Sequence, residues 1–135
     1  MIAKRILIFG AVLIGLLNIP SIQGNPQQDI FDDIESSIAV GNADKLSNHL
    51  NSSVELELPG EIEGIYSKQQ SVVILRKFFN KYPPQSFKIV HRGNGTGGNK
   101  FSVGDYRTGG ERIFRVTIFV KKVDSKYLIQ EIEFE

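Results

Sequence analysis

The chain has 135 residues, contains no cysteine and carries a formal net charge of +1 at pH 7. A length of this order fits a single domain. The lack of cysteine excludes disulfides, cysteine-ligated metals and cysteine nucleophiles. The near-neutral charge gives no reason to expect a nucleic-acid partner.

The N-terminal stretch 1–24 has the pattern of a secretory signal peptide. Lys4 and Arg5 form a basic start, an apolar run follows at 6–17, and a short polar stretch comes after it. The run is short for a membrane span, which needs about 20 residues. We therefore expect cleavage of this stretch, a single domain over 25–135, a periplasmic or secreted location and no stable membrane span after cleavage. The alternative is an uncleaved N-terminal anchor.

Three amphipathic segments predict helices in the first part of this domain. The first begins near 25–26, where proline suits the first helical position, and ends at Gly41. A short second helix covers 43–50. The third begins with a capping box at 67–70 and ends before the proline pair 83–84. We expect it to bury Val72, Leu75, Phe78, Phe79 and Tyr82.

β-branched and aromatic residues with period-two alternation predict six strands. They cover 54–58, 62–66, 86–92, 100–107, 111–123 and 127–134.

The loop between the last two strands decides which of their faces meet. A two-residue loop at 124–125 would place glutamates opposite the apolar face, whereas a three-residue loop at 124–126 pairs Ile118 with Ile132. Burial therefore favours the longer loop, although a bulge would serve equally well. In this register Gln130 lies on the apolar face.

The order of elements predicts an α+β fold: a curved antiparallel sheet, made of a four-strand C-terminal meander and a short N-terminal hairpin, covered on its concave face by three helices. This order resembles the nuclear transport factor 2-like superfamily, the cone fold shared with ketosteroid isomerases. Several words in order also resemble a secreted bacterial family of unknown function, domain of unknown function 4783. They include Tyr66-Ser67-Lys68-Gln69-Gln70, Phe78-Phe79, His91-Arg92-Gly93 and Phe114-Arg115-Val116. The resemblance implies the cone fold and export, and it brings no known activity.

His91 is the residue most easily taken for a catalytic base. It follows two apolar residues at period two, so we expect its ring to face the helices. If Arg92 pairs with Lys100, the carboxylate of Asp105 lies roughly 13 Å away along the strand at ~3.3 Å per residue. We therefore predict a structural or pocket-wall histidine.

Two further sequence patterns do not predict a metal site or a phosphate-binding site. His49 and His91 lack the close spacing of metal ligands, so we predict no metal and no cofactor. The glycine-rich stretch 93–99 is followed by a strand, whereas phosphate loops lead into a helix.

The function predicted best is an exported, non-enzymatic module that binds a small apolar ligand or a peptide in a cone-shaped pocket. One alternative is an isomerase- or hydrolase-type enzyme that uses His91 with Asp105 or Tyr106. The other is an interaction protein or homodimer that uses the outer sheet face. The predicted pocket wall contains His91, Tyr66, Phe79, Phe101, Phe114 and Gln130.

Overall fold

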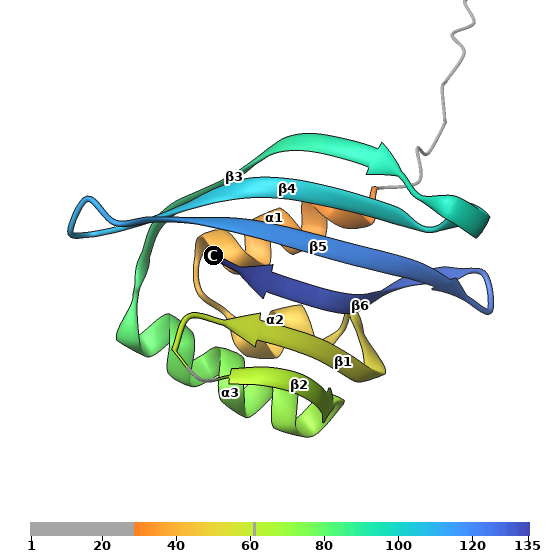
Figure 1. Ribbon diagram of the computed structural model, residues 1–135, viewed down its shortest axis with the longest axis horizontal. Helices are drawn as coiled ribbons and strands as arrows, with labels where there is room; N and C mark the ends of the chain where they lie inside the picture. The colour runs from red at the N-terminus through yellow and green to blue at the C-terminus, as the bar shows by residue number, and fades with distance from the viewer. Residues whose placement is uncertain (1–28, 61) are drawn as a thin grey trace, which may run out of the picture.

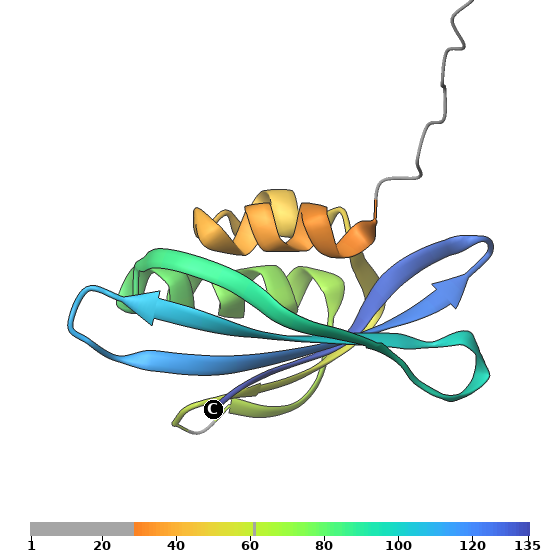
Figure 2. The same ribbon diagram turned by 90° about the horizontal axis from the view of Figure 1, so that it is seen from above.

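The computed structural model describes residues 29–60 and 62–135, so the predicted signal peptide lies outside the described residues. Its strands form one curved sheet in the order β2-β1-β6-β5-β4-β3, with the helices on one face (Figures 1 and 2). None of the helices in these two ranges is long and apolar enough to cross a membrane. The elements are α1 (Ile30–Ala39), α2 (Ala43–Ser47), β1 (Leu50–Leu58), β2 (Ile62–Ser67), α3 (Lys68–Lys81), β3 (Pro84–Asn94), β4 (Lys100–Thr108), β5 (Ile113–Val123) and β6 (Lys126–Phe134).

The β1–β2 hairpin joins the meander through β1, which runs parallel to β6, while the other neighbouring strands are antiparallel. The predicted hairpin and meander are therefore parts of one sheet. We call the face that the helices cover the concave face, and the opposite face the outer face.

The helices begin at residues whose side chains accept hydrogen bonds from the free backbone amides of the first helical turn. Asp29 caps α1 by accepting a hydrogen bond from the Phe31 amide at 3.0 Å. The predicted capping box of α3 is confirmed: Ser67 Oγ accepts from the Gln70 amide at 3.1 Å, and Gln70 Oε1 accepts from the Ser67 amide at 3.0 Å. The second helix is shorter than predicted, because Leu50 already belongs to β1.

The β5–β6 hairpin reaches its predicted register by a different route. Asp124 and Ser125 form a two-residue loop, and both have positive φ (51° and 73°), as a type I′ turn requires. A bulge at Gln130 then shifts the pairing, so that Ile118 lies opposite Ile132. The predicted pairing is confirmed. The favoured three-residue loop is wrong, and the bulge considered as its alternative is what the chain uses. The bulge turns Gln130 to the outer face, where its side chain is exposed.

A second bulge changes the face of β3. Ile89 pairs with Gly104 and lies half-buried, but His91 pairs with Val103 and its side chain is exposed on the outer face. The amide of Ile89 donates to a carboxylate oxygen of Glu35 on α1 at 2.7 Å, which ties α1 to this part of β3. The predicted pairing of Arg92 with Lys100 and the inward-facing His91 are both wrong, because the extra residue reverses the alternation.

Aromatic side chains fill the concave face. The Phe78 ring on α3 lies 4.4 Å from that of Phe134, 5.4 Å from that of Phe114 and 5.8 Å from that of Tyr106, measured between centroids. Phe79 stacks on Tyr106 at 6.2 Å. These contacts join α3 to β4, β5 and β6, and they make the aromatic cluster the centre of the core.

Phe79 is only 3% exposed, so its predicted place in the helix–sheet interface is confirmed. Phe79→Ala should lower the free energy of unfolding by about 3–5 kcal/mol, because the buried ring leaves a cavity. Urea denaturation measures this loss. Val73→Ala, on the exposed side of the same helix, is the control and should change stability by about 0.5 kcal/mol at most. Similar losses for the two variants would contradict the assignment of the buried helix face.

Candidate functional site: the mouth of the cone

The aromatic cluster fills the concave face except at one end of the sheet, where open space remains around the β1–β2 turn. Two hollows meet this turn and share Leu58, Pro59, Gly60 and Ile62. The strand-end hollow, of about 410 Å³, also reaches the start of β5 and the end of β6. The helix-side hollow, of about 360 Å³, also reaches the last two turns of α3. We call this region the mouth of the cone.

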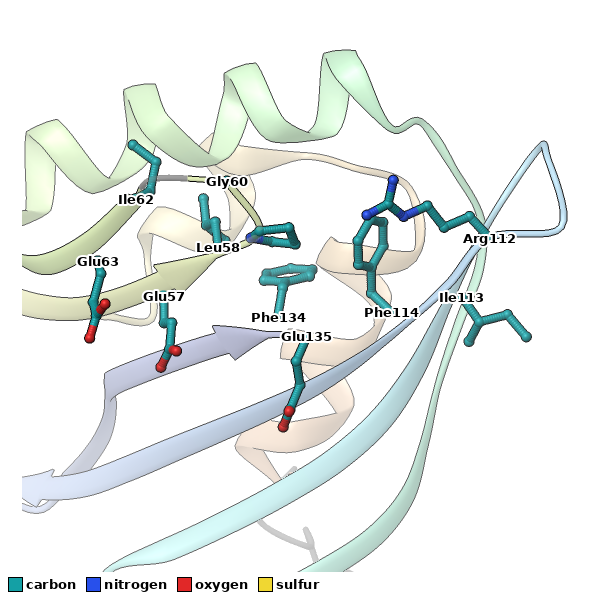
Figure 3. Close-up of a pocket in the computed structure, with 11 residues that line it drawn as sticks. Glu57, Leu58, Gly60, Ile62, Glu63, Arg112, Ile113, Phe114, Phe134 and Glu135 are labelled. Atoms are coloured by element: carbon teal, nitrogen blue, oxygen red, sulfur yellow. The ribbon is translucent and has the colours of Figure 1, made fainter.

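The strand-end hollow has two chemically different sides. Phe114, Phe134 and Arg112 point toward α3, whereas Glu57, Glu63 and Glu135 point away from it (Figure 3). Negative charge is therefore concentrated on the outer side of this hollow, and positive charge lies on the side of α3.

Arg112 lies over the aromatic rim of the mouth. Its guanidinium carbon is 4.5 Å from the ring centroid of Phe114 and 5.1 Å from that of Tyr82. Distances of this size are typical of a cation–π contact. Arg112 belongs to the β4–β5 connection and Tyr82 to the end of α3, so this contact brings two distant parts of the chain together.

The helix-side hollow combines an apolar wall with two lysines. Ile74 and Phe78 line it together with the shared turn residues, and Lys77 and Lys81 stand beside them on α3. The Lys81 ammonium is 5.4 Å from the Tyr82 ring centroid. An apolar hollow with a few polar groups is the usual composition of a small-molecule site.

The six predicted pocket-wall residues do not form one site. Phe114 lines the strand-end hollow, Phe79 is packed inside the core, and Tyr66 on β2 is half-buried against the core. The other three belong to the outer face, and this corrects their predicted place. The Phe101 ring lies 5.6 Å from that of His91 there, and Gln130 lines a separate hollow of about 220 Å³.

The catalytic arrangement considered for His91 does not form. Asp105 pairs across the strands with Lys88 and Arg115, and its carboxylate contacts Arg115 at 3.4 Å. Tyr106 is fully buried on the opposite face, where its hydroxyl donates to the carbonyl of Tyr82. Burial raises the pKa of Tyr106, so its phenol gives up a proton even less readily than an exposed tyrosine. Neither partner proposed for His91 is therefore placed to act with it.

Three mouth residues were missed by the sequence analysis as site residues. Lys77 and Lys81 stand near the end of the third predicted helix, where the helix dipole favours cations whether or not a ligand binds, and Arg112 falls at the start of the strand predicted over 111–123. The four-residue spacing of Lys77 and Lys81, on the helix face of Ile74 and Phe78, was the available signal. The position of Arg112 depends on the tertiary fold and had no local signal.

Carboxylates dominate the outer face beside the mouth. Glu55 pairs with Glu131, and Glu57 pairs with both Glu133 and Glu63 across neighbouring strands. Like charges that face each other across strands destabilise a sheet. No group of these or other side chains in 29–60 and 62–135 has the geometry to hold a metal ion.

Residues 31–135 match the family described as "Domain of unknown function (DUF4783)". The chain belongs to the DUF4783 family. Its structure is similar to that of a DUF4783 family protein from Bacteroides ovatus ATCC 8483, with 27% sequence identity, a TM-score of 0.69, and coverage of 76% of this chain and 90% of that chain. No curated protein matches the chain significantly.

More distant structures share the fold. An NTF-2 like protein of unknown function from Shewanella oneidensis MR-1 is 16% identical, with a TM-score of 0.55 and coverage of 78% of this chain and 92% of that chain. A proposed ketosteroid isomerase from Shewanella frigidimarina NCIMB 400 is 12% identical, with a TM-score of 0.60 and coverage of 78% and 91%. These comparisons confirm the predicted family and the predicted nuclear transport factor 2-like fold. At such identities, the isomerase shows the fold alone.

The carboxylates of the outer face should make stability depend on pH. Burial, a hydrogen bond with Glu135 and the charge of Glu57 raise the pKa of Glu133 from 4.5 to about 7. Because the pKa is raised in the folded state, stability should fall as pH rises from about 4.5 to about 7. Glu133→Gln removes this ionisation. It should match the wild type near pH 4 and be more stable near pH 8, by up to about 1 kcal/mol for exposed cross-strand charges.

Urea denaturation at the two pH values measures this difference. Glu111→Gln, in the β4–β5 turn, makes the same change in net charge and is the control. Equal pH dependence in the wild type and in Glu133→Gln would show that the outer-face charges do not interact as described.

Proposed function

We propose that the protein is an exported, non-enzymatic module that holds a small apolar ligand in the helix-side hollow at the mouth of the cone. The observation that carries the proposal is the apolar wall of this hollow, formed by Leu58, Ile62, Ile74 and Phe78. Its volume of about 360 Å³ falls within the range of known ligand pockets. Export rests on the N-terminal pattern of a signal peptide.

The choice of the mouth over the interior follows from packing. Phe78 and Phe114 are 6% and 2% exposed, and the rings around them occupy the concave face. Protein interiors are close-packed, so a ligand there would have to displace aromatic side chains. The mouth offers apolar surface without that cost.

The proposal includes no enzymatic role because of where the side chains considered for catalysis lie. His91 and Asp105 lie on the outer face, away from both mouth hollows, and Tyr106 is enclosed in the core. General acid–base catalysis needs the acid or base within hydrogen-bonding reach of the reacting group. A binding role therefore fits the described residues better than the isomerase or hydrolase alternative.

Filling the helix-side hollow tests the proposed function. Ile74→Trp places a large ring in the hollow and should abolish the fluorescence increase of the neutral apolar probe Nile red. Val73→Trp, at the neighbouring residue that is 45% exposed, adds the same side chain outside the hollow and should bind the probe like the wild type. Circular dichroism checks that both variants fold.

Unchanged binding by folded Ile74→Trp would place the probe elsewhere and contradict the proposed site. Loss of binding in both variants would show that the effect does not come from filling the hollow, and would also contradict the proposal.

A further inference from the structure

The cations around Tyr82 point to a particular chemical class of ligand. We infer that the helix-side hollow binds a small amphiphile whose apolar tail ends in a carboxylate. The inference rests on the proposed function, because it names the ligand of the same hollow. Its separate support is the arrangement of charge around that hollow.

Two cations from different elements approach one aromatic ring. The Lys81 ammonium lies 5.4 Å and the Arg112 guanidinium 5.1 Å from the Tyr82 centroid. Lys77 stands four residues before Lys81 on α3, a spacing at which like charges repel. These three side chains therefore place positive charges close together at this rim, although like charges repel each other.

The three cations have no carboxylate partner within 4.0 Å among the described residues. The negative end of the α3 dipole favours Lys77 and Lys81 where they stand. It does not explain Arg112, which comes from the β4–β5 connection and reaches over Phe114 to the same ring. An anion at the rim would offset the charge of all three.

The three described glutamates that line the strand-end hollow do not supply that anion. Glu57, Glu63 and Glu135 point away from α3, toward the outer side of the strand-end hollow (Figure 3). A ligand carboxylate is therefore complementary to the α3 side of the mouth alone. Its tail would lie against the apolar wall that contains Ile74 and Phe78.

The charge pattern predicts an order of affinity for ligands with the same tail. A carboxylate gains charge-assisted contacts with the rim, a hydroxyl gains little, and an ammonium is repelled. Decanoate should therefore bind most tightly, decanol about tenfold more weakly, and decylammonium most weakly. The advantage of decanoate should shrink at about 0.5 M salt, because these charges are exposed to solvent.

Titration of the ¹⁵N-labelled protein with each compound, followed by NMR, measures the affinities and locates the site. The double variant Lys81→Gln, Arg112→Gln should bind decanoate only as tightly as decanol. Its decanol affinity should stay as in the wild type, which shows that the hollow is intact. The control Lys45→Gln, Arg107→Gln removes the same two kinds of charge from exposed positions elsewhere and should keep the preference for decanoate.

The outcomes separate the inference from the proposed function. If all three compounds bind at the hollow with equal affinity, the carboxylate inference is wrong and the proposed function stands. If decylammonium binds most tightly, the inference is also wrong. If none of the three shifts the amide signals of residues 74–82, both the inference and the proposed function are contradicted.

Discussion

The packing of aromatic rings around Phe78 is the contact on which the rest of the structure depends. Phe78 belongs to α3, and its ring meets those of Tyr106 on β4, Phe114 on β5 and Phe134 on β6. One side chain therefore joins the longest helix to three strands of the sheet. Because these rings occupy the concave face, the open space of the cone lies where they end, beside Tyr82 and the β1–β2 turn. The core thus decides where open space remains for the proposed ligand.

The sequence predicted the order of the elements and the pairing of the last two strands well. Burial of Ile118 against Ile132 needs no knowledge of the loop, because the alternative register exposes apolar side chains and buries carboxylates. The sequence left two routes to this register open, a longer loop or a bulge, and favoured the one that the chain does not use. A loop of Asp124 and Ser125 followed by a bulge gives the same pairing as a longer loop, and both are compatible with these residues.

The candidate site was much less predictable, and particular residues show why. A bulge at Gln130 and another before His91 reverse the face of each side chain, so strict alternation placed both on the wrong side of the sheet. Lys81 and Arg112 are 31 positions apart, and only the folded chain brings both to the Tyr82 ring. Alternation and helical spacing describe single elements, whereas this mouth is formed by the ends of several.

The central claim is that a ligand lies at the mouth of the cone and not among the packed rings. Intermolecular nuclear Overhauser effects between the tail of bound decanoate and the methyl groups of the protein test it most directly. The account predicts contacts to Ile62 and Ile74, which line the helix-side hollow. Contacts to Ile118, which is fully buried in the core, or to Val103 on the outer face would contradict it.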